Sequence, residues 1–256
     1  MPNFDRIISY GCSHMAALET VDHEYHPDAD KIKEKHGYPF FRRLLCENKD
    51  FDYSEYIENG KRYSWPVLLA KKLNVPCLNK AVPANSLYKI IYEFESDQSS
   101  GSLTDRDLIF IDLVNPFRLI DFTDEKMVDT FNLNLPISWR ENLRHGSDYF
   151  LQFFNDDFCS FNYILALKYL ASYQNKFNIY FTLPVRKHLF DLIESKKFKI
   201  LRDMRQNIIL DLRLITSISL MNDCVWDRKR EKYFGHAKPI AHERYAEIIY
   251  KKIHLN

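Results

Sequence analysis

The chain has 256 residues and a mass of 30.6 kDa, enough for one large domain with a sizeable core. Lysine and arginine number 36 and aspartate and glutamate 35, so the formal net charge of +1 gives no overall field that would select nucleic acid or an anionic membrane. Hydrophobic residues make up 46% and charged residues 28%, which is typical of a folded globular chain and excludes a disordered one.

Glycine and cysteine usage excludes several common kinds of site. The six glycines are scattered, so neither a G-x-G-x-x-G motif nor a Walker A loop can be written. The five cysteines are odd in number and contain no C-x-x-C pair, which disfavours a zinc finger and a disulfide framework. With no apolar leader and no apolar run of about 20 residues, the sequence predicts a soluble, cytoplasmic protein with no nucleic-acid or membrane partner.

The first predicted element is a short β-strand over Arg6–Tyr10. It is followed by a tight turn at Gly11–His14 and by a helix from Met15 to Glu19. The polar, aromatic and charged residues around 20–62 are predicted to form a helical insertion. A second insertion around 119–150 is predicted to form part of a lid.

Strands and helices alternate along the rest of the chain. The pattern predicts a helix over Trp65–Leu73, a strand over Val75–Asn79, a helix over Ser86–Glu95, a strand over Asp107–Val114, a helix over Phe161–Tyr173, a strand over Phe177–Pro184, an apolar segment of either type over Leu210–Ser219, and a helix over Ala241–Ile253.

This alternation predicts an α/β fold with a mostly parallel sheet. Ligand sites in such sheets lie beyond the carboxyl ends of the strands. Three segments follow predicted strands and are therefore expected to converge on one edge: Gly11–His14, Asn79–Ser86 and Val114–Arg118.

Two side chains in these positions could carry chemistry. Ser13 follows the first strand, where its hydroxyl could be exposed beside a helix N-terminus, or where it could simply cap that helix. His236 is predicted to stand on a loop before the last helix, available either as a general base or as a solvated imidazole. His242, at the start of that helix, is expected to be a capping or packing group.

Taken together, three blocks resemble the SGNH, or GDSL-like, hydrolase superfamily. The first is a hydrophobic strand followed by G-x-S, here Gly11–Ser13. The second, of the form N-x-A-x-x-G-x-S, is similar to Asn79–Ser86, and the third resembles His236, Pro239 and His242. The G-C-S form of the first block is similar to SGNH-like proteins often seen in bacteriophage genomes.

The resemblance implies a single domain over residues 1–256 with a flavodoxin-like three-layer α/β/α fold, enlarged by the two insertions. It also implies a serine esterase acting on an O-acyl ester. Because the two insertions could frame a cleft, an O-acetyl group on carbohydrate is the preferred substrate. Ser13 would attack the acyl carbon and His236 would take its proton, with no metal or organic cofactor. The N–H groups of Ser13 and Ala84 would hold the oxyanion, and Asn115 would assist through its amide.

Several positions depart from the family pattern. Ala84 replaces the oxyanion-hole glycine, and Asn115 lies about one position from the expected asparagine. Tyr233 replaces the acid expected three residues before the histidine. His236 would then be oriented by a backbone carbonyl, by Asp227 or by Asp223, or by no group. Arg118 could clamp an anionic substrate group or form a structural ion pair.

Two other functions remain open at this level. An acyltransferase would use the same Ser-His pair, and a non-catalytic binding protein on this scaffold is suggested by Tyr233 in the acid position. The acidic and histidine-containing run over Asp22–Asp30 is interpreted as a solvated surface rather than a metal site, and Cys12 as a small buried filler.

Overall fold

The computed structural model describes residues 4–13, 15–18, 20–83, 85–114, 118–123, 126–132, 156–183, 214–216, 224–227 and 232–255. Within these, it describes only the backbone at 38–39, 118–132, 156–163, 183, 214–216, 224–227, 232–236 and 254–255.

The centre of the fold is a five-stranded parallel sheet in the order β2-β1-β3-β6-β7. This is the flavodoxin-like strand order 2-1-3-4-5, which confirms the predicted fold class. The strands are β1 (Arg6–Tyr10), β2 (Cys77–Asn79), β3 (Asp107–Asp112), β6 (Asn178–Leu183) and β7 (Leu214–Thr216).

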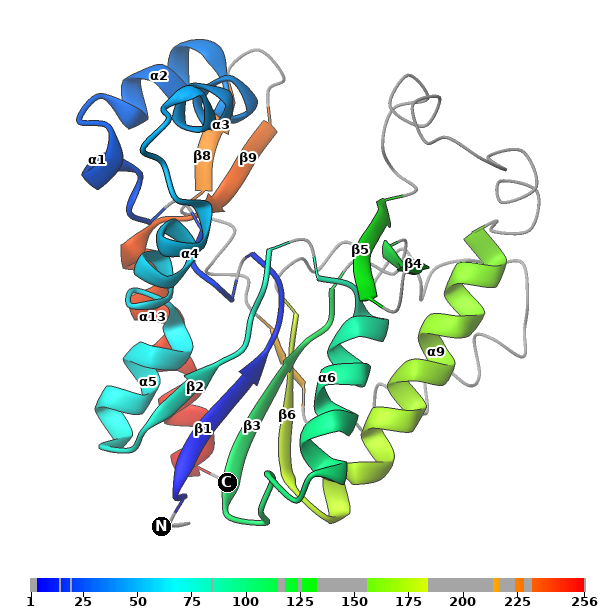
Figure 1. Cartoon of the computed structure of the whole chain (residues 1–256). Coiled ribbons are helices and arrows are strands. Elements are labelled where there is room, and N and C mark those ends of the chain that lie inside the picture. The colour runs from blue at the N-terminus through cyan, green and yellow to red at the C-terminus, as the bar shows by residue number, and fades with distance from the viewer. Residues whose placement is uncertain are drawn as a thin grey trace.

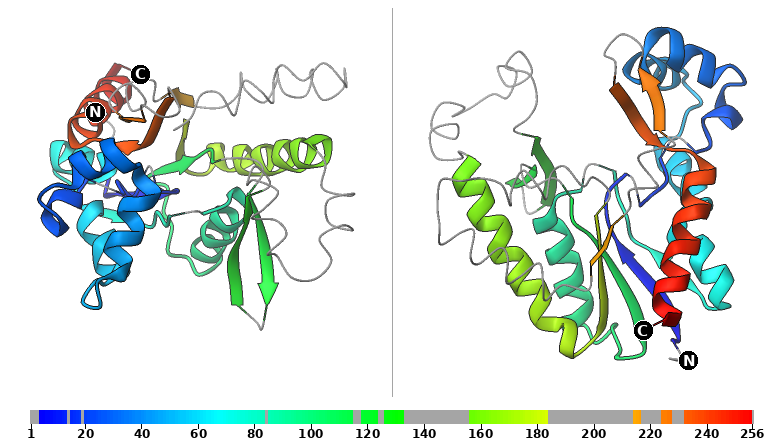
Figure 2. Two further views of the ribbon diagram at one scale, coloured as in Figure 1. Left: turned by 90° about the horizontal axis from the view of Figure 1, so that it is seen from above. Right: turned by 180° about the vertical axis from the view of Figure 1, so that it is seen from behind.

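Helices cover both faces of this sheet and complete three layers (Figures 1 and 2). One face carries α6 and α9, and the other carries α5 and α13. Their bounds are α5 (Trp65–Leu73), α6 (Leu87–Ser99), α9 (Asp156–Ser172), which continues into a 3-10 turn (Tyr173–Asn175), and α13 (Pro239–Leu255).

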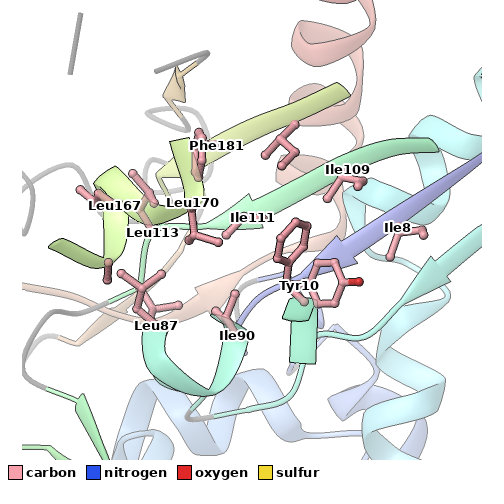
Figure 3. Packing of buried hydrophobic residues seen from close by; sticks show 14 of the residues in the cluster. Ile8, Tyr10, Leu87, Ile90, Ile109, Ile111, Leu113, Leu167, Leu170 and Phe181 are labelled. Atoms are coloured by element: carbon pink, nitrogen blue, oxygen red, sulfur yellow. The ribbon is translucent and has the colours of Figure 1, made fainter. Parts of the chain in front are cut away.

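The alternation of side chains along the strands divides the core into two clusters. Ile109 and Ile111 of β3 point towards α6 and α9, where Figure 3 shows them packed with Leu87, Leu170 and Phe181. Leu108 and Phe110 of the same strand belong to the cluster formed with α5 and α13. Because β3 is buried on both faces, its sequence reads as a continuous apolar run between two aspartates.

The insertion predicted around 20–62 is a cap of four helices above the sheet (Figure 1). Its helices pack around a small apolar cluster that includes Val21, Phe41, Leu45 and Tyr56, together with Leu18 from the turn after β1. The helices are α1 (Asp22–Tyr25), α2 (Ala29–His36), α3 (Tyr38–Glu47) and α4 (Tyr53–Lys61).

Two antiparallel hairpins lie outside the central sheet. The first, β4 (Arg118–Thr123) with β5 (Lys126–Asn132), begins the insertion predicted around 119–150, whose residues 133–150 lie outside the described part of the chain. The second, β8 (Cys224–Asp227) with β9 (Lys232–Ala237), lies beside α2 and α3 and leads into α13 (Figure 1). In the described part of the chain, every helix is too short or too polar to cross a bilayer.

The structure corrects two of the predicted elements. Residues 15–18 form successive turns rather than a helix, because Ala17 has a left-handed φ of 54° that a right-handed helix cannot include. His236 lies in β9 rather than on a loop, because residues 232–237 pair with β8.

Candidate active site

The turn after β1 is packed so tightly that its first residue must be glycine. A Cβ on Gly11 would lie 2.6 Å from Met15 Sδ and 2.7 Å from Asp112 Oδ2. Both distances are far inside van der Waals contact, so any larger residue would displace the turn or the end of β3. Gly11 therefore fixes where the chain leaves the sheet, two residues before Ser13.

Backbone hydrogen bonds then fold the chain back on itself around Ser13. The N–H groups of Met15 and Ala16 donate to the Cys12 carbonyl at 3.0 and 2.9 Å, and Leu18 N–H donates to the Ser13 carbonyl at 3.1 Å. Because turns at residues 15–18 replace the predicted helix, Ser13 does not cap that helix. The expectation of an exposed serine is also corrected, since Ser13 is only 7% exposed. Cys12 is buried, as predicted.

The second sequence block runs directly beside this turn. Val82 N–H donates to the Gly11 carbonyl at 3.1 Å, and the side-chain amide of Asn85 donates to the same oxygen at 3.3 Å. Asn85 is completely buried. The segment after β2 therefore holds the turn after β1 in place, as expected for neighbouring parallel strands that end at one edge.

Asn79, at the end of β2, uses both ends of its amide to join four parts of the chain. Its Oδ1 accepts from the Ser9 hydroxyl at 3.1 Å and from Ala81 N–H at 3.0 Å. Its Nδ2 donates to the Met15 carbonyl at 3.1 Å and to Ser64 Oγ at 3.0 Å. These four hydrogen bonds give the Asn79 side chain a structural role. They link β1, the turn after Ser13 and the start of α5.

The third block reaches the same edge of the sheet through His242. This imidazole is completely buried, and its Nδ1 accepts the N–H of Trp65, the first residue of α5, at 3.3 Å. Trp65 follows Ser64, which Asn79 binds. His242 is thus a buried packing group, as predicted, but its hydrogen bond is to the first N–H of α5 rather than to its own helix. It ties the start of α13 to elements that contact the Ser13 turn.

The β8–β9 hairpin gives the backbone position of His236 and of the candidate acids. Trp226 pairs with Tyr233, and Asp227 pairs with Lys232, near the tip of the hairpin. His236 lies near the other end of β9, four residues from Lys232, a distance of about 13 Å along a strand. This register counts against Asp227 as the group that orients His236. The side chains of Asp227 and His236 lie outside the described residues, as does Asp223.

The side chains of three other predicted site residues lie outside the described part of the chain. Ala84 and Asn115 lie outside the described residues, although the segments on either side of Ala84 run beside Gly11. Arg118 begins β4 opposite Asn132, and only its backbone is described.

Sequence reasoning missed the carboxyl group that underlies the turn. Asp112, the last residue of β3, accepts the backbone N–H of Cys12 and the hydroxyl of Thr182 from β6, and the Cys12 thiol lies 4.0 Å from it. Burial disfavours its charged form and raises the pKa of Asp112 to about 7, although the two hydrogen bonds act in the opposite direction. The sequence feature that could have identified Asp112 is a polar residue at the end of an otherwise apolar buried strand.

Charged and metal-ligating side chains elsewhere form structural contacts. Asp22 is buried, paired with Lys33 at 3.0 Å and accepting the Tyr56 hydroxyl at 2.5 Å, which corrects the prediction of a solvated surface at this one residue of the run. His23, Glu24, Asp28 and Asp30 are exposed, as predicted. Within the described ranges, no three histidine, cysteine, aspartate or glutamate side chains are grouped to hold a metal ion.

The chain matches no protein-family model, and no curated protein is similar to it in sequence. Several solved structures are similar to it, among them the following three. A protein assigned to the G-D-S-L family of lipolytic proteins, from Desulfitobacterium hafniense DCB-2, has 9% identity and a TM-score of 0.44, covering 96% of this chain and 98% of its own. A carbohydrate esterase, whose active site displays divergent catalytic and non-catalytic binding functions, has 12% identity and a TM-score of 0.49, covering 100% and 67%. A catalytic mutant of an acetylxylan esterase from Geobacillus stearothermophilus has 10% identity and a TM-score of 0.43, covering 99% and 95%.

One of these three is assigned to the family that the sequence blocks resemble. At such identities and TM-scores, the likeness carries no conclusion about activity or about individual residues. The fold class of this chain rests on its own strand order.

Proposed function

We propose that the chain is a serine hydrolase that removes an acyl group from an oxygen ester, with Ser13 as nucleophile and His236 as general base. The observation that carries the proposal is the convergence of the three sequence blocks. Asn79 binds the Met15 carbonyl beyond Ser13, it also binds Ser64, and the next residue, Trp65, binds His242 of the final block. Blocks separated by more than 200 residues are thereby tied to one edge of the sheet, where ligand sites of this architecture lie.

In the proposed reaction, Ser13 Oγ attacks the acyl carbon while His236 accepts the hydroxyl proton. The C–O bond to the alcohol then breaks, and the alcohol leaves with that proton. Water hydrolyses the acyl-serine ester in the second half, with His236 again moving the proton. The N–H groups of Ser13 and Ala84, with the amide of Asn115, would hold the negative oxygen of each tetrahedral intermediate.

The substrate class that we propose is an O-acetylated carbohydrate. The helical cap stands beside the edge of the sheet that carries Ser13, and α4 touches the turn directly through Gly60, whose Cβ position lies 3.0 Å from the Ala17 carbonyl. A cap in this position supports a substrate larger than a simple ester. Arg118 would contact an anionic group where the substrate has one.

The test uses the purified chain with p-nitrophenyl acetate, an acetylated xylooligosaccharide and a fluorophosphonate probe. We expect acetate release from both esters and labelling at Ser13, with both lost in Ser13→Ala and turnover lost in His236→Ala. Ser172→Ala and His36→Ala, which alter exposed residues outside the site, are the matched controls and should behave as wild type. Absence of labelling and turnover in the wild-type chain would contradict the proposal.

The same experiment extends to the alternatives and to the missing acid. Adding an alcohol acceptor and analysing products distinguishes acyl transfer from hydrolysis. Asp223→Asn and Asp227→Asn together test which carboxylate, if either, supports His236, and the hairpin register leads us to expect no effect from Asp227→Asn.

A non-catalytic binding protein is the second candidate. It is favoured by Tyr233 in the usual acid position and by the register that sets Asp227 far along the hairpin from His236. This candidate predicts saturable binding of an acetylated oligosaccharide by calorimetry, without acetate release and without labelling of Ser13.

A further inference from the structure

Asp112 is a buried carboxyl group whose contacts with the described residues lead to the Ser13 turn and to the neighbouring strand. It is 2% exposed, and within the described residues no cation acts on it. The groups that face it are the Cys12 N–H and thiol from the turn, the Thr182 hydroxyl from β6, and Met15 Sδ, which lies beside the same space over Gly11. An isolated buried carboxyl group is costly, so its contacts must offset that cost.

The carboxyl group links the turn after β1 to the ends of β3 and β6, in addition to the backbone pairing of these strands. Figure 1 shows β3 and β6 side by side in the sheet. Asp112 and Thr182 are register partners on these parallel strands, and the Thr182 hydroxyl donates to the carboxyl group. From the turn, Cys12 donates its N–H, and Gly11 lies so close that its missing Cβ would come within 2.7 Å of Oδ2. The turn therefore packs directly against the carboxyl group, so a displacement of the carboxyl group would also displace the turn.

We propose that Asp112, held by Thr182, is a positioning residue that fixes the Gly11–Cys12–Ser13 turn and with it the direction of the Ser13 hydroxyl. The inference rests on the proposed function of Ser13. In this proposal the carboxyl group makes no contact with the substrate. It acts on Ser13 through the N–H of Cys12, the preceding residue. Misplacing a reacting group by about 1 Å can slow an enzymatic step by about 100-fold.

Asp107 provides a matched control on the same strand. It is also buried, at 1% exposed, but it lies at the opposite end of β3 and pairs with Arg6. Asp107→Asn should lower the melting temperature and leave the reactivity of Ser13 unchanged. A purely structural role for Asp112 would make the two variants behave alike.

The experiment measures kcat and KM for p-nitrophenyl acetate and the rate constant for fluorophosphonate labelling of Ser13. We expect Asp112→Asn to lower kcat and the labelling rate about tenfold with KM within about twofold of wild type. Thr182→Val, which removes the hydroxyl while keeping the shape, should lower both by a smaller factor, and Thr182→Ser should restore them. Wild-type kcat and labelling in Asp112→Asn, or equal losses in Thr182→Ser and Thr182→Val, would overturn the inference.

A second readout separates this inference from the proposed function. In the inactive Ser13→Ala variant, the amide signal of Cys12 in a ¹H–¹⁵N spectrum should shift with pH as one group titrates, and the added Asp112→Asn change should abolish that shift. If the wild-type chain is neither labelled nor active, the proposed function fails. The Cys12 titration still decides whether Asp112 holds the turn, and its absence would overturn the inference by itself.

Discussion

The Ser13 turn and the helical cap are both buried structures, but they are fixed in different ways. The turn is held from several strands and loops at once: Asp112 and Thr182 lie below it, Asn79 and Asn85 lie beside it, and glycine stands where no side chain fits. The cap depends on one small apolar cluster and one buried ion pair, Lys33 with Asp22. The comparison teaches that the turn carrying the proposed nucleophile is fixed by several separate strands and loops, whereas the cap packs around a cluster formed mostly by its own helices.

The largest expected contrast comes from removing one buried ring from each region. Phe110 in β3 and Phe41 in α3 are both completely buried, but Phe110 packs between Trp65 and Tyr180 in the larger cluster. Phe110→Ala should cost about 3–5 kcal/mol of unfolding free energy. Phe41→Ala should cost less, because a small cluster can collapse around the cavity. Chemical denaturation of both variants checks this, and equal losses would remove the distinction.

The pH dependence of stability tests the turn. Because the pKa of Asp112 is raised to about 7 in the folded chain, the folded state keeps a proton that the unfolded state releases near its ordinary value of 3.8. Stability from this group therefore falls as pH rises from about 4 to 7, by about 4 kcal/mol at most. Relative to Asp112→Asn, the wild-type chain should lose stability over that window and show no further change above it. A difference that is constant with pH would contradict this.

Breaking the ion pair tests the cap. Lys33→Met leaves the Asp22 carboxylate buried without its cation and should cost about 3 kcal/mol. Lys31→Met, on the same helix, removes an exposed pair with Asp28 and should produce no measurable change. Thermal unfolding of the two variants gives the comparison. If the pair were dispensable, Lys33→Met would unfold at the same temperature as Lys31→Met.

The smallest expected effects concern the two glycines at close approaches. Gly11→Ala forces contacts under 3 Å with Met15 and Asp112, and it should cost about 1–3 kcal/mol and slow labelling of Ser13. Gly60→Ala brings its Cβ 3.0 Å from the Ala17 carbonyl and 3.3 Å from that of Ala16, so a small adjustment relieves it and a smaller loss is expected. Denaturation midpoints and labelling rates rank the two, and a reversed order would show that the cap constrains the turn more than β3 does.

Periodic patterns in the sequence predicted the sheet and its covering helices. The bounds of β1 and α5 agree with the prediction at both ends, because each has a clear apolar pattern and a clear stop signal. The helix predicted after Ser13 was wrong, because the left-handed Ala17 carries no sequence signature. The β8–β9 hairpin was not predicted either, since its register shifts between Cys224 and Trp226 and weakens any alternation.

The candidate site was likewise predicted only in part. Gly11–Ser13 and the block beginning at Asn79 were predicted from their order, and the structure brings them together. The roles of Asn79, Asn85 and Asp112 arise from contacts between residues that lie far apart in the sequence. Local periodicity contains no information about such contacts, so these roles could not be predicted from it.

The contact between α4 and the turn limits how this fold can be redesigned. The helix reaches the carbonyls of Ala16 and Ala17 at a residue with no side chain, so the cap is fitted to the main chain beneath it. A chimaera in which residues 20–62 are replaced by the cap of another protein would need a glycine at the corresponding position of the new helix. Without that glycine, the new cap would either pack further from the rest of the fold or displace the turn that carries Ser13.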